Sequence, residues 1–111
     1  MRVTFTSGKL AKDCSSDRER LRRFGAERAR KLKLRLDQMQ AAASITELMT
    51  LPGTRCHQLS TDRDEQFSVD LDGPYRLIFE VDVDPVPRRQ DAGIDLDAID
   101  AVAVIEIADT H

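Results

Sequence analysis

The sequence predicts a single α+β domain spanning residues 1–111, with one N-terminal strand, then two or three helices, then several strands. Three observations lead to this prediction. The length of 111 residues is that of one ordinary domain. The spacing of apolar residues changes near Gly53 from a helical period to the twofold alternation of strands. The composition, 41% apolar and 33% charged, is typical of a globular protein and not of a disordered chain.

The composition also excludes several classes of protein. No apolar run approaches the ~18 residues of a membrane span, and the N-terminus lacks the apolar stretch of a signal peptide. We therefore expect a cytoplasmic protein without membrane contact. Cys14 and Cys56 lie far apart and have no metal-ligand spacing with either histidine, so we expect free structural thiols and neither metal nor cofactor.

The first half of the chain predicts a short strand and then helix. Residues 2–6 (RVTFT) alternate apolar and polar side chains, which favours a strand. Ser16 and Glu19 have the spacing of a capping box and indicate a helix start. Gly25 is expected to divide a short helix from a longer one, since glycine costs about 1 kcal/mol in a helix interior. One helix face is predicted from residues three or four apart: Gly25, Ala29, Leu32, Leu36, Met39 and Ala43.

The second half predicts a sheet. Residues 44–50 indicate one more capped turn of helix, which a Leu-Pro-Gly break ends at 51–53. Residues 67–71 and 75–81 alternate apolar and polar side chains on either side of an Asp-Gly pair, which is a strong hairpin signal.

The end of the chain combines a loop with an apolar strand. Residues 82–98 contain prolines, a glycine and several aspartates without any period, so a loop insertion is predicted there. Residues 101–108 (AVAVIEIA) are almost continuously apolar, which is typical of a strand buried on both faces and central in its sheet.

The charges are distributed unevenly along the chain. Residues 1–55 contain 13 Lys and Arg against 6 Asp and Glu, a balance of +7, whereas residues 56–111 contain 4 against 14, a balance of −10. This division indicates either that the first half faces a polyanion or that the two halves neutralise each other in the fold. An ordinary charged, solvated surface is the third reading.

Four segments in order resemble one known family. They are the basic helix RKLKLRLDQMQAAASITEL (30–48), then LPGTRCHQLSTDRDEQFSVDLDGPYRLIFE (51–80), PVPRRQDAGIDLDAI (85–99) and VIEIADTH (104–111). With these motifs the chain resembles HigB-type toxins of the RelE/ParE superfamily, which include the plasmid maintenance system killer and killer-suppression proteins. The most specific parts are residues 52–79 and 105–111.

The resemblance implies a RelE-like fold and a function. The fold is a mostly antiparallel, twisted sheet with helices on one face and a concave RNA-binding face on the other. The function is that of a toxin in a type II toxin–antitoxin system, an endoribonuclease that cuts mRNA on the ribosome. Its partners are the ribosome, mRNA and a HigA-like helix-turn-helix antitoxin.

The resemblance also assigns roles to residues of the last half of the chain. Cleavage of RNA without a metal needs a base for the 2′-OH, an acid for the leaving oxygen and cations for the phosphate. His57 and His111 match the histidines of the family motifs and are the proton-transfer candidates. Arg76 matches a family arginine and, on a strand, faces away from the apolar row, as a phosphate clamp would. Asp109 is expected to orient His111 or to contact RNA.

Further cations are candidates for phosphate binding. Arg63 matches a family arginine in the hairpin loop, although its acidic neighbours favour a local salt bridge. Arg28, Lys31 and Arg35 line one flank of the predicted helix face. They are expected either to bind RNA backbone or to pair with acidic groups of this chain or of the antitoxin.

Two other functions stay open. Ser60 and Thr110 stand where the family often has Lys and Tyr, which removes a charge and a stacking ring. These departures favour a catalytically weakened member of the fold that acts mainly as a protein-binding module for its antitoxin. A less favoured alternative is a gyrase-directed toxin of the ParE branch.

Overall fold

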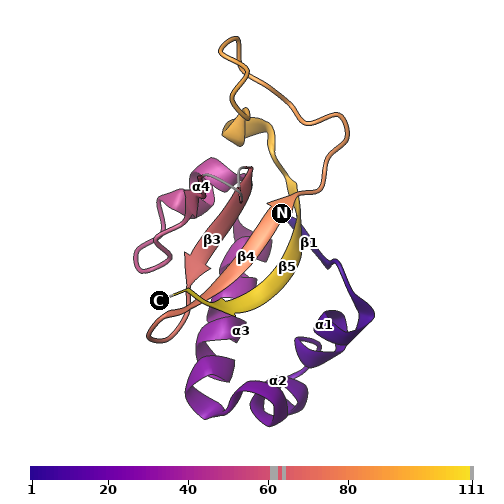
Figure 1. Cartoon of the computed structure of the whole chain (residues 1–111), viewed down its shortest axis with the longest axis vertical. Helices are drawn as coiled ribbons and strands as arrows, with labels where there is room; N and C mark the ends of the chain where they lie inside the picture. Colours follow the sequence, from indigo (N-terminus) through magenta and orange to yellow (C-terminus); the bar gives the residue numbers. More distant parts are fainter. Residues whose placement is uncertain (61–62, 64, 111) are drawn as a thin grey trace.

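The computed structural model describes residues 1–60, 63 and 65–110 of the chain, and Figure 1 shows their arrangement. The elements are, in order, β1 (Arg2–Phe5), α1 (Gly8–Asp13), α2 (Asp17–Phe24), α3 (Ala26–Ala41), α4 (Ile45–Met49), β2 (His57–Gln58), β3 (Gln66–Asp70), β4 (Tyr75–Val81), the 3-10 helix η2 (Leu96–Ala98) and β5 (Ala101–Asp109). In the described residues this gives four α-helices and a five-stranded sheet. The predicted α+β class is confirmed, with one α-helix more than expected.

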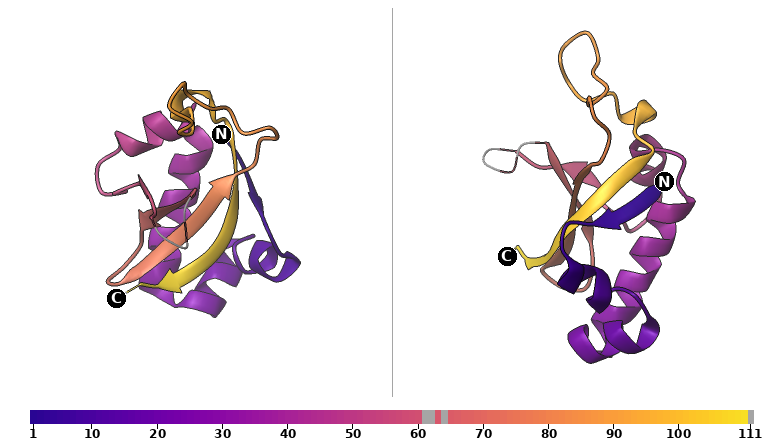
Figure 2. Two further views of the ribbon diagram at one scale, coloured as in Figure 1. Left: turned by 45° about the horizontal axis from the view of Figure 1, so that its top comes forward. Right: turned by 90° about the vertical axis from the view of Figure 1, so that its right-hand side faces the viewer.

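The sheet is mixed and mostly antiparallel. Its strand order is β1-β5-β4-β3-β2, and only β1 and β5 run parallel. The apolar strand β5 is interior, as its sequence predicts, although β4 occupies the middle of the five. The predicted burial on both faces holds only for residues 101–104, because residues 105–108 are half-buried. A β-bulge interrupts the β4–β5 ladder between Ile78 and Phe79, and such bulges increase the local twist. Figure 2 shows the resulting twisted sheet.

The helices begin where the serines predict. The Oγ atom of Ser16 accepts a hydrogen bond from the amide of Glu19 at 3.1 Å, and that of Ser44 caps α4 in the same way. Gly25 separates α2 from α3 with a φ of +80°, a conformation that glycine adopts without strain. The six-residue α1, capped by Ser7, was not predicted because one and a half turns show no helical period.

The buried face of α3 is the predicted one, with a correction at its end. Ala29, Leu32, Leu36 and Met39 are buried. Ala43, however, is exposed and Ala42 is buried. The reason is that α3 ends at Ala41 and Ala42 has an extended backbone, so the helical period stops two residues before the sequence pattern suggests.

The core lies between one face of the sheet and the helices α3 and α4. Phe67 of β3 and Phe79 of β4 stand opposite each other, with ring centroids 5.4 Å apart and both side chains fully buried. Helix α3 runs along this face, as the right-hand view of Figure 2 shows. The opposite face of β3 and β4 is left for other contacts.

The segment between β4 and β5, where an insertion is predicted, projects beyond the sheet in Figure 1. Two of its apolar residues, Ile94 and Ile99, are nevertheless buried in the main core. Arg88 of this segment forms a two-pronged ion pair with Glu65, which precedes β3. The segment therefore contacts the rest of the protein through both apolar packing and an ion pair.

In the part of the chain that the structure describes, no helix has both the length and the apolar character needed to cross a bilayer.

Arg35 is buried, which corrects the expectation that it faces solvent and binds RNA. Its side chain points from α3 toward the sheet and is only 4% exposed. Its guanidinium donates to the carbonyls of Asp70 and Gly53, both at 2.7 Å, and to the side chain of Gln38 at 3.0 Å. Arg35 therefore joins α3 to β3 and to the turn after α4.

Replacing Arg35 by Ala is expected to lower the free energy of unfolding by about 3 kcal/mol, because two part-buried hydrogen bonds from its charged guanidinium to carbonyls are lost, each worth about 1.5–3 kcal/mol. Urea denaturation measures the difference. The matched control is Arg30→Ala on the same helix, since Arg30 is exposed. An equal, small effect of both substitutions would contradict the structural role of Arg35.

The two cysteines are free and buried, as predicted. Burial raises the pKa of the Cys14 thiol to about 11 and that of Cys56 to about 12. Because the thiolate is the reactive form, both are expected to react very slowly with a disulfide reagent at pH 8 in the folded protein and rapidly in denaturant. Rapid labelling of either residue without denaturant would contradict this placement.

Candidate functional site

An open hollow of about 640 Å³ lies on the side of the sheet that α3 does not cover. Four predicted site residues line it: His57, Arg63, Arg76 and Asp109. Ser60 and Thr110, the two positions that depart from the family pattern, also line it. The buried side chains of Ser68 and Ile78 form its floor. Residues from β2, β4, the β2–β3 connection and the end of β5 are thus brought together.

His57 lies on the short edge strand β2 and is exposed. Its Nδ1 atom is 2.8 Å from the carbonyl oxygen of Arg55. A carbonyl oxygen can only accept a hydrogen bond, so Nδ1 must be the donor. In the neutral imidazole this leaves the lone pair on Nε2, and the ring can accept a proton there. The geometry is that of a general base whose tautomer is fixed by the backbone.

Arg76 faces away from the core, as the strand alternation predicts. Its Nε atom donates to the carboxylate of Asp70 at 2.9 Å, and Nη1 donates to the carbonyls of Gly73 and Tyr75, both at 2.9 Å. Asp70 lies directly opposite Arg76 across the β3–β4 ladder. These contacts fix the guanidinium beside the hollow through Nε and Nη1, and no described residue forms a hydrogen bond with Nη2.

Asp70 is the site residue that sequence reasoning missed. Its carboxylate pairs with Arg76 and lies 3.6 Å from the Nε atom of Arg55. A signal was present, because Asp70 alternates with core residues and therefore lies on the same face as Ser68. The hairpin at Asp72-Gly73 also sets the register that places it opposite Arg76.

Arg63 reaches across the hollow to β5. It forms an ion pair with Glu106 and a hydrogen bond with Gln66 at 3.2 Å. The sequence favoured a local bridge to its acidic neighbours instead. Of these neighbours, Glu65 pairs with Arg88, and the other two lie outside the described residues. The partner on a distant strand places Arg63 at the rim of the hollow.

The end of the chain is attached to the β3–β4 hairpin. Thr110 donates both its backbone amide and its hydroxyl to the carbonyl of Pro74, each at 3.0 Å. Asp109, opposite Tyr75 in the sheet register, is thereby placed at the hollow. His111, the second predicted proton-transfer residue, lies outside the described residues.

The basic helix directs Arg28 into an internal ion pair. Arg28 binds the carboxylate of Asp72 with two hydrogen bonds, at 3.0 and 3.2 Å, and stacks over the Tyr75 ring at 3.3 Å. Like the buried Arg35, it is engaged inside the protein, so the expected pairing with an acidic group of this chain is observed for Arg28. A phosphate-binding role for Arg28 stays a prediction. Lys31 is half-buried, and its role as a phosphate ligand stays a prediction.

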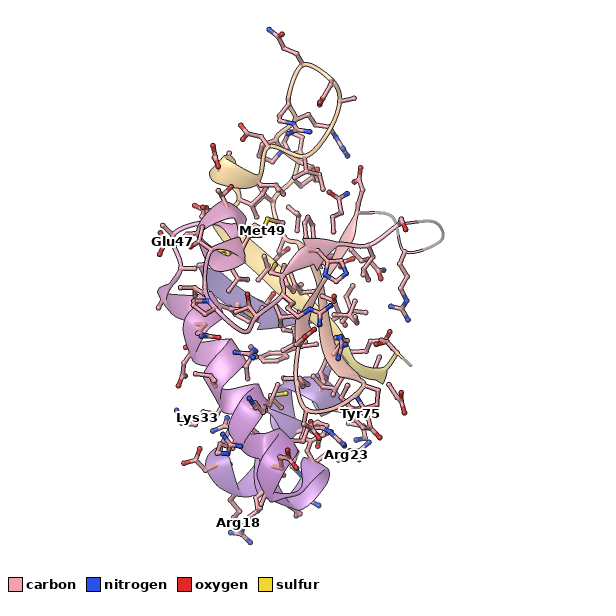
Figure 3. All side chains as sticks on the ribbon, turned by 90° about the vertical axis from the view of Figure 1, so that its left-hand side faces the viewer. Arg18, Arg23, Lys33, Glu47, Met49 and Tyr75 are labelled. Atoms are coloured by element: carbon pink, nitrogen blue, oxygen red, sulfur yellow. The ribbon has the colours of Figure 1, made fainter. Side chains whose placement is uncertain are left out.

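Other cations of the helices point outward. Figure 3 shows Arg18 at the far end of the helices and Lys33 on their outer side. Lys33 is paired with Asp37 at 2.9 Å, whereas Arg18 and Arg30 are exposed and have no ion-pair partner among the described residues. The charge available to a polyanion is therefore at α2 and the first turns of α3.

The His57 tautomer is directly testable. In long-range 1H–15N NMR spectra at a pH where imidazole is neutral, we expect the proton of His57 on Nδ1 and none on Nε2. Denaturing the protein removes the contact with Arg55 and serves as the control. An Nε2-protonated ring in the folded protein would contradict the assignment of Nε2 as the proton acceptor.

Comparison with known proteins now identifies the family. Residues 5–88 match the family model described as the RelE-like toxin of type II toxin-antitoxin system HigB. The matched part includes His57, Arg63 and Arg76 and ends before β5. No curated protein matches the chain. Because the family model matches more than half of its residues, the chain belongs to the HigB-like toxins, the RelE-like toxins of type II toxin–antitoxin systems.

Proposed function

We propose that this toxin is an endoribonuclease that cuts mRNA on the ribosome, with the hollow between β2, β4 and the end of β5 as its active site. The supporting observation is the convergence of one exposed imidazole and two guanidinium groups, from His57, Arg76 and Arg63, on one open surface. These are the group types that RNA cleavage without a metal requires. They come from separate parts of the chain and meet only in the folded protein.

The proposed reaction begins at His57. Its Nε2 atom accepts the proton of a ribose 2′-OH, and the resulting oxygen attacks the adjacent phosphorus. The bond from phosphorus to the 5′-oxygen breaks, and a protonated group returns a proton to that oxygen. The products are a 2′,3′-cyclic phosphate and a 5′-hydroxyl. His111 is the predicted second proton-transfer group, with Asp109 as the residue that orients it.

The arginines supply the positive charge. The phosphate gains negative charge in the transition state, and fixed donors aimed at it lower the barrier without reorganising. Arg76 is suited to this role because Asp70 and the hairpin carbonyls fix its orientation. Arg63 is the second clamp, which must exchange Glu106 for the phosphate.

The composition of the hollow favours dependence on the ribosome. Its described lining contains no Phe, Tyr or Trp ring, and stacking of bases on such large rings is worth about 1–3 kcal/mol per base. A free RNA strand would thus be held weakly, whereas the ribosome presents mRNA already positioned. The outward cations Arg18 and Arg30, together with the half-buried Lys31, are suited to contact with ribosomal RNA.

The function as an antitoxin-binding module with weakened catalysis is the second candidate. The observation in its favour is that both arginines of the hollow are paired with carboxylates, Asp70 and Glu106. In either case we propose a HigA-like helix-turn-helix protein as the antitoxin and the cytoplasm as the site of action.

The nuclease proposal is tested by inducing the toxin without antitoxin and mapping new mRNA ends on translating ribosomes. His57→Ala is expected to lower cleavage at least 100-fold, because general acid–base groups contribute about 10²–10⁴. Arg76→Ala is expected to lower it about 10²–10³-fold, as for other transition-state donors. Arg89→Ala, on the exposed segment between β4 and β5, is the control and leaves cleavage unchanged.

His111→Ala, examined beside them, is expected to lose cleavage as well. Growth arrest with new ends that these variants abolish supports the nuclease. Antitoxin binding without cleavage at any expression level would favour the binding module, and arrest with altered DNA supercoiling but intact mRNA would favour a gyrase-directed toxin.

A further inference from the structure

The outer edge of β5 is only half covered. Strand β1 pairs with its first four residues, Ala101 to Val104, and the last contact is the hydrogen bond from the Thr6 amide to the Val104 carbonyl, at 3.0 Å. The chain then turns away into α1. Among the described residues, no strand lies beside the outer edge of residues 105–109. Five residues at ~3.3 Å each give an edge of roughly 17 Å, the length of an ordinary strand.

A groove of about 260 Å³ runs beside this edge. Leu10 of α1, Phe24 of α2 and the side of β5 at Ile105 and Ile107 give it apolar walls. All four side chains are half-buried. Natural proteins usually blunt or cover a sheet edge of this length, because its amides and carbonyls otherwise pair with another chain. Here the apolar walls add hydrophobic contacts for any chain that pairs with the edge.

The rim of the groove is basic. Helices α1 and α2, over residues 8–24, contain six Lys and Arg against three Asp and Glu. Two carboxylates line the groove, those of Asp13 and Glu106. That of Asp13 is already shared by Lys9, at 2.9 Å, and Arg23, at 3.5 Å. Glu106 pairs with Arg63 toward the other face. An extended segment with acidic side chains fits this rim better than a basic or neutral one.

We propose that the uncovered edge of β5, residues 105–109, docks an extended acidic segment of the antitoxin, which adds to the sheet as a further strand. Backbone hydrogen bonds along the edge supply the affinity, and alternate side chains enter the groove, as in other cases of strand addition. An apolar side chain lies between Leu10 and Phe24, and acidic side chains flank it near Lys9 and Arg23. The inference rests on membership in the toxin family and not on the nuclease proposal.

The position of the edge has a consequence for inhibition. The docked strand lies beside β5, whereas His57 and Arg76 lie on β2 and β4, farther along the sheet. Strand addition alone therefore leaves these residues uncovered and serves to anchor the antitoxin. Inhibition then depends on other parts of the antitoxin, or on its blocking access to the ribosome.

The test uses the full toxin co-purified with the protein encoded by the adjacent reading frame. Hydrogen exchange is measured by mass spectrometry for the toxin alone and in the complex. We expect the amides of residues 105–109 to gain protection of at least tenfold in the complex. Failure to form a complex, or protection confined to the hollow or to α3, would overturn the proposal. Concentration-dependent protection in the toxin alone would assign the edge to a second copy and also overturn it.

A pair of variants makes the test specific. Ile105→Glu introduces a negative charge beside the edge and is expected to weaken antitoxin binding at least tenfold. Leu34→Glu makes the same kind of change on the exposed surface of α3, where Leu34 is 42% exposed, and is expected to leave binding unchanged. Equal affinities of the two variants would contradict the proposal, and the hydrogen-exchange result stands even if Ile105→Glu folds poorly.

Discussion

Asp70, the last residue of β3, joins the fold to the candidate site. Its main chain belongs to the fold: the carbonyl accepts from Arg35 of α3 at 2.7 Å, and the amide donates to the carbonyl of Thr54 at 2.8 Å. Its side chain belongs to the site: the carboxylate holds Arg76 and lies beside Arg55. Since the Arg55 carbonyl in turn binds His57, both candidate groups are positioned with reference to one strand end. A shift of β3 on α3 would move them together.

The uneven charge of the chain is resolved in part within the fold, by three ion pairs between the two halves in the described residues. Basic residues of the first half pair with acidic residues of the second: Arg2 with Asp82, Arg28 with Asp72, and Arg55 with Asp70. The acidic sheet half therefore does not give a uniformly negative RNA-facing surface, because its carboxylates orient arginines there. An incoming phosphate must therefore compete with Asp70 and Glu106 for these arginines, which agrees with the proposed dependence on the ribosome.

Local patterns predicted the fold well, because capping boxes, an Asp-Gly hairpin and changes of period are properties of neighbouring residues. The same patterns placed Arg76 on the correct face. They failed where the partner is distant in sequence. Arg35 resembled a solvated helix residue because its acceptors, the carbonyls of Gly53 and Asp70, have no side-chain signature. The pairing of Arg63 with Glu106 requires the β2–β3 connection to lie beside β5. The pattern of neighbouring residues does not reveal this contact. The half-covered edge of β5 depends on where β1 stops pairing.

The central claim is that the RNA strand to be cut binds in the hollow around Arg76, whereas the basic helices do not hold this strand. The most direct measurement is an NMR titration of the full chain, at low salt, with a short 2′-O-methyl RNA, which lacks the attacking hydroxyl and stays intact. The account predicts shifts of the Arg76 Nε–H signal and of the Ser68 and Ile78 amides at the floor of the hollow. Shifts confined to α2 and α3, with the Arg76 signal unchanged, would contradict it.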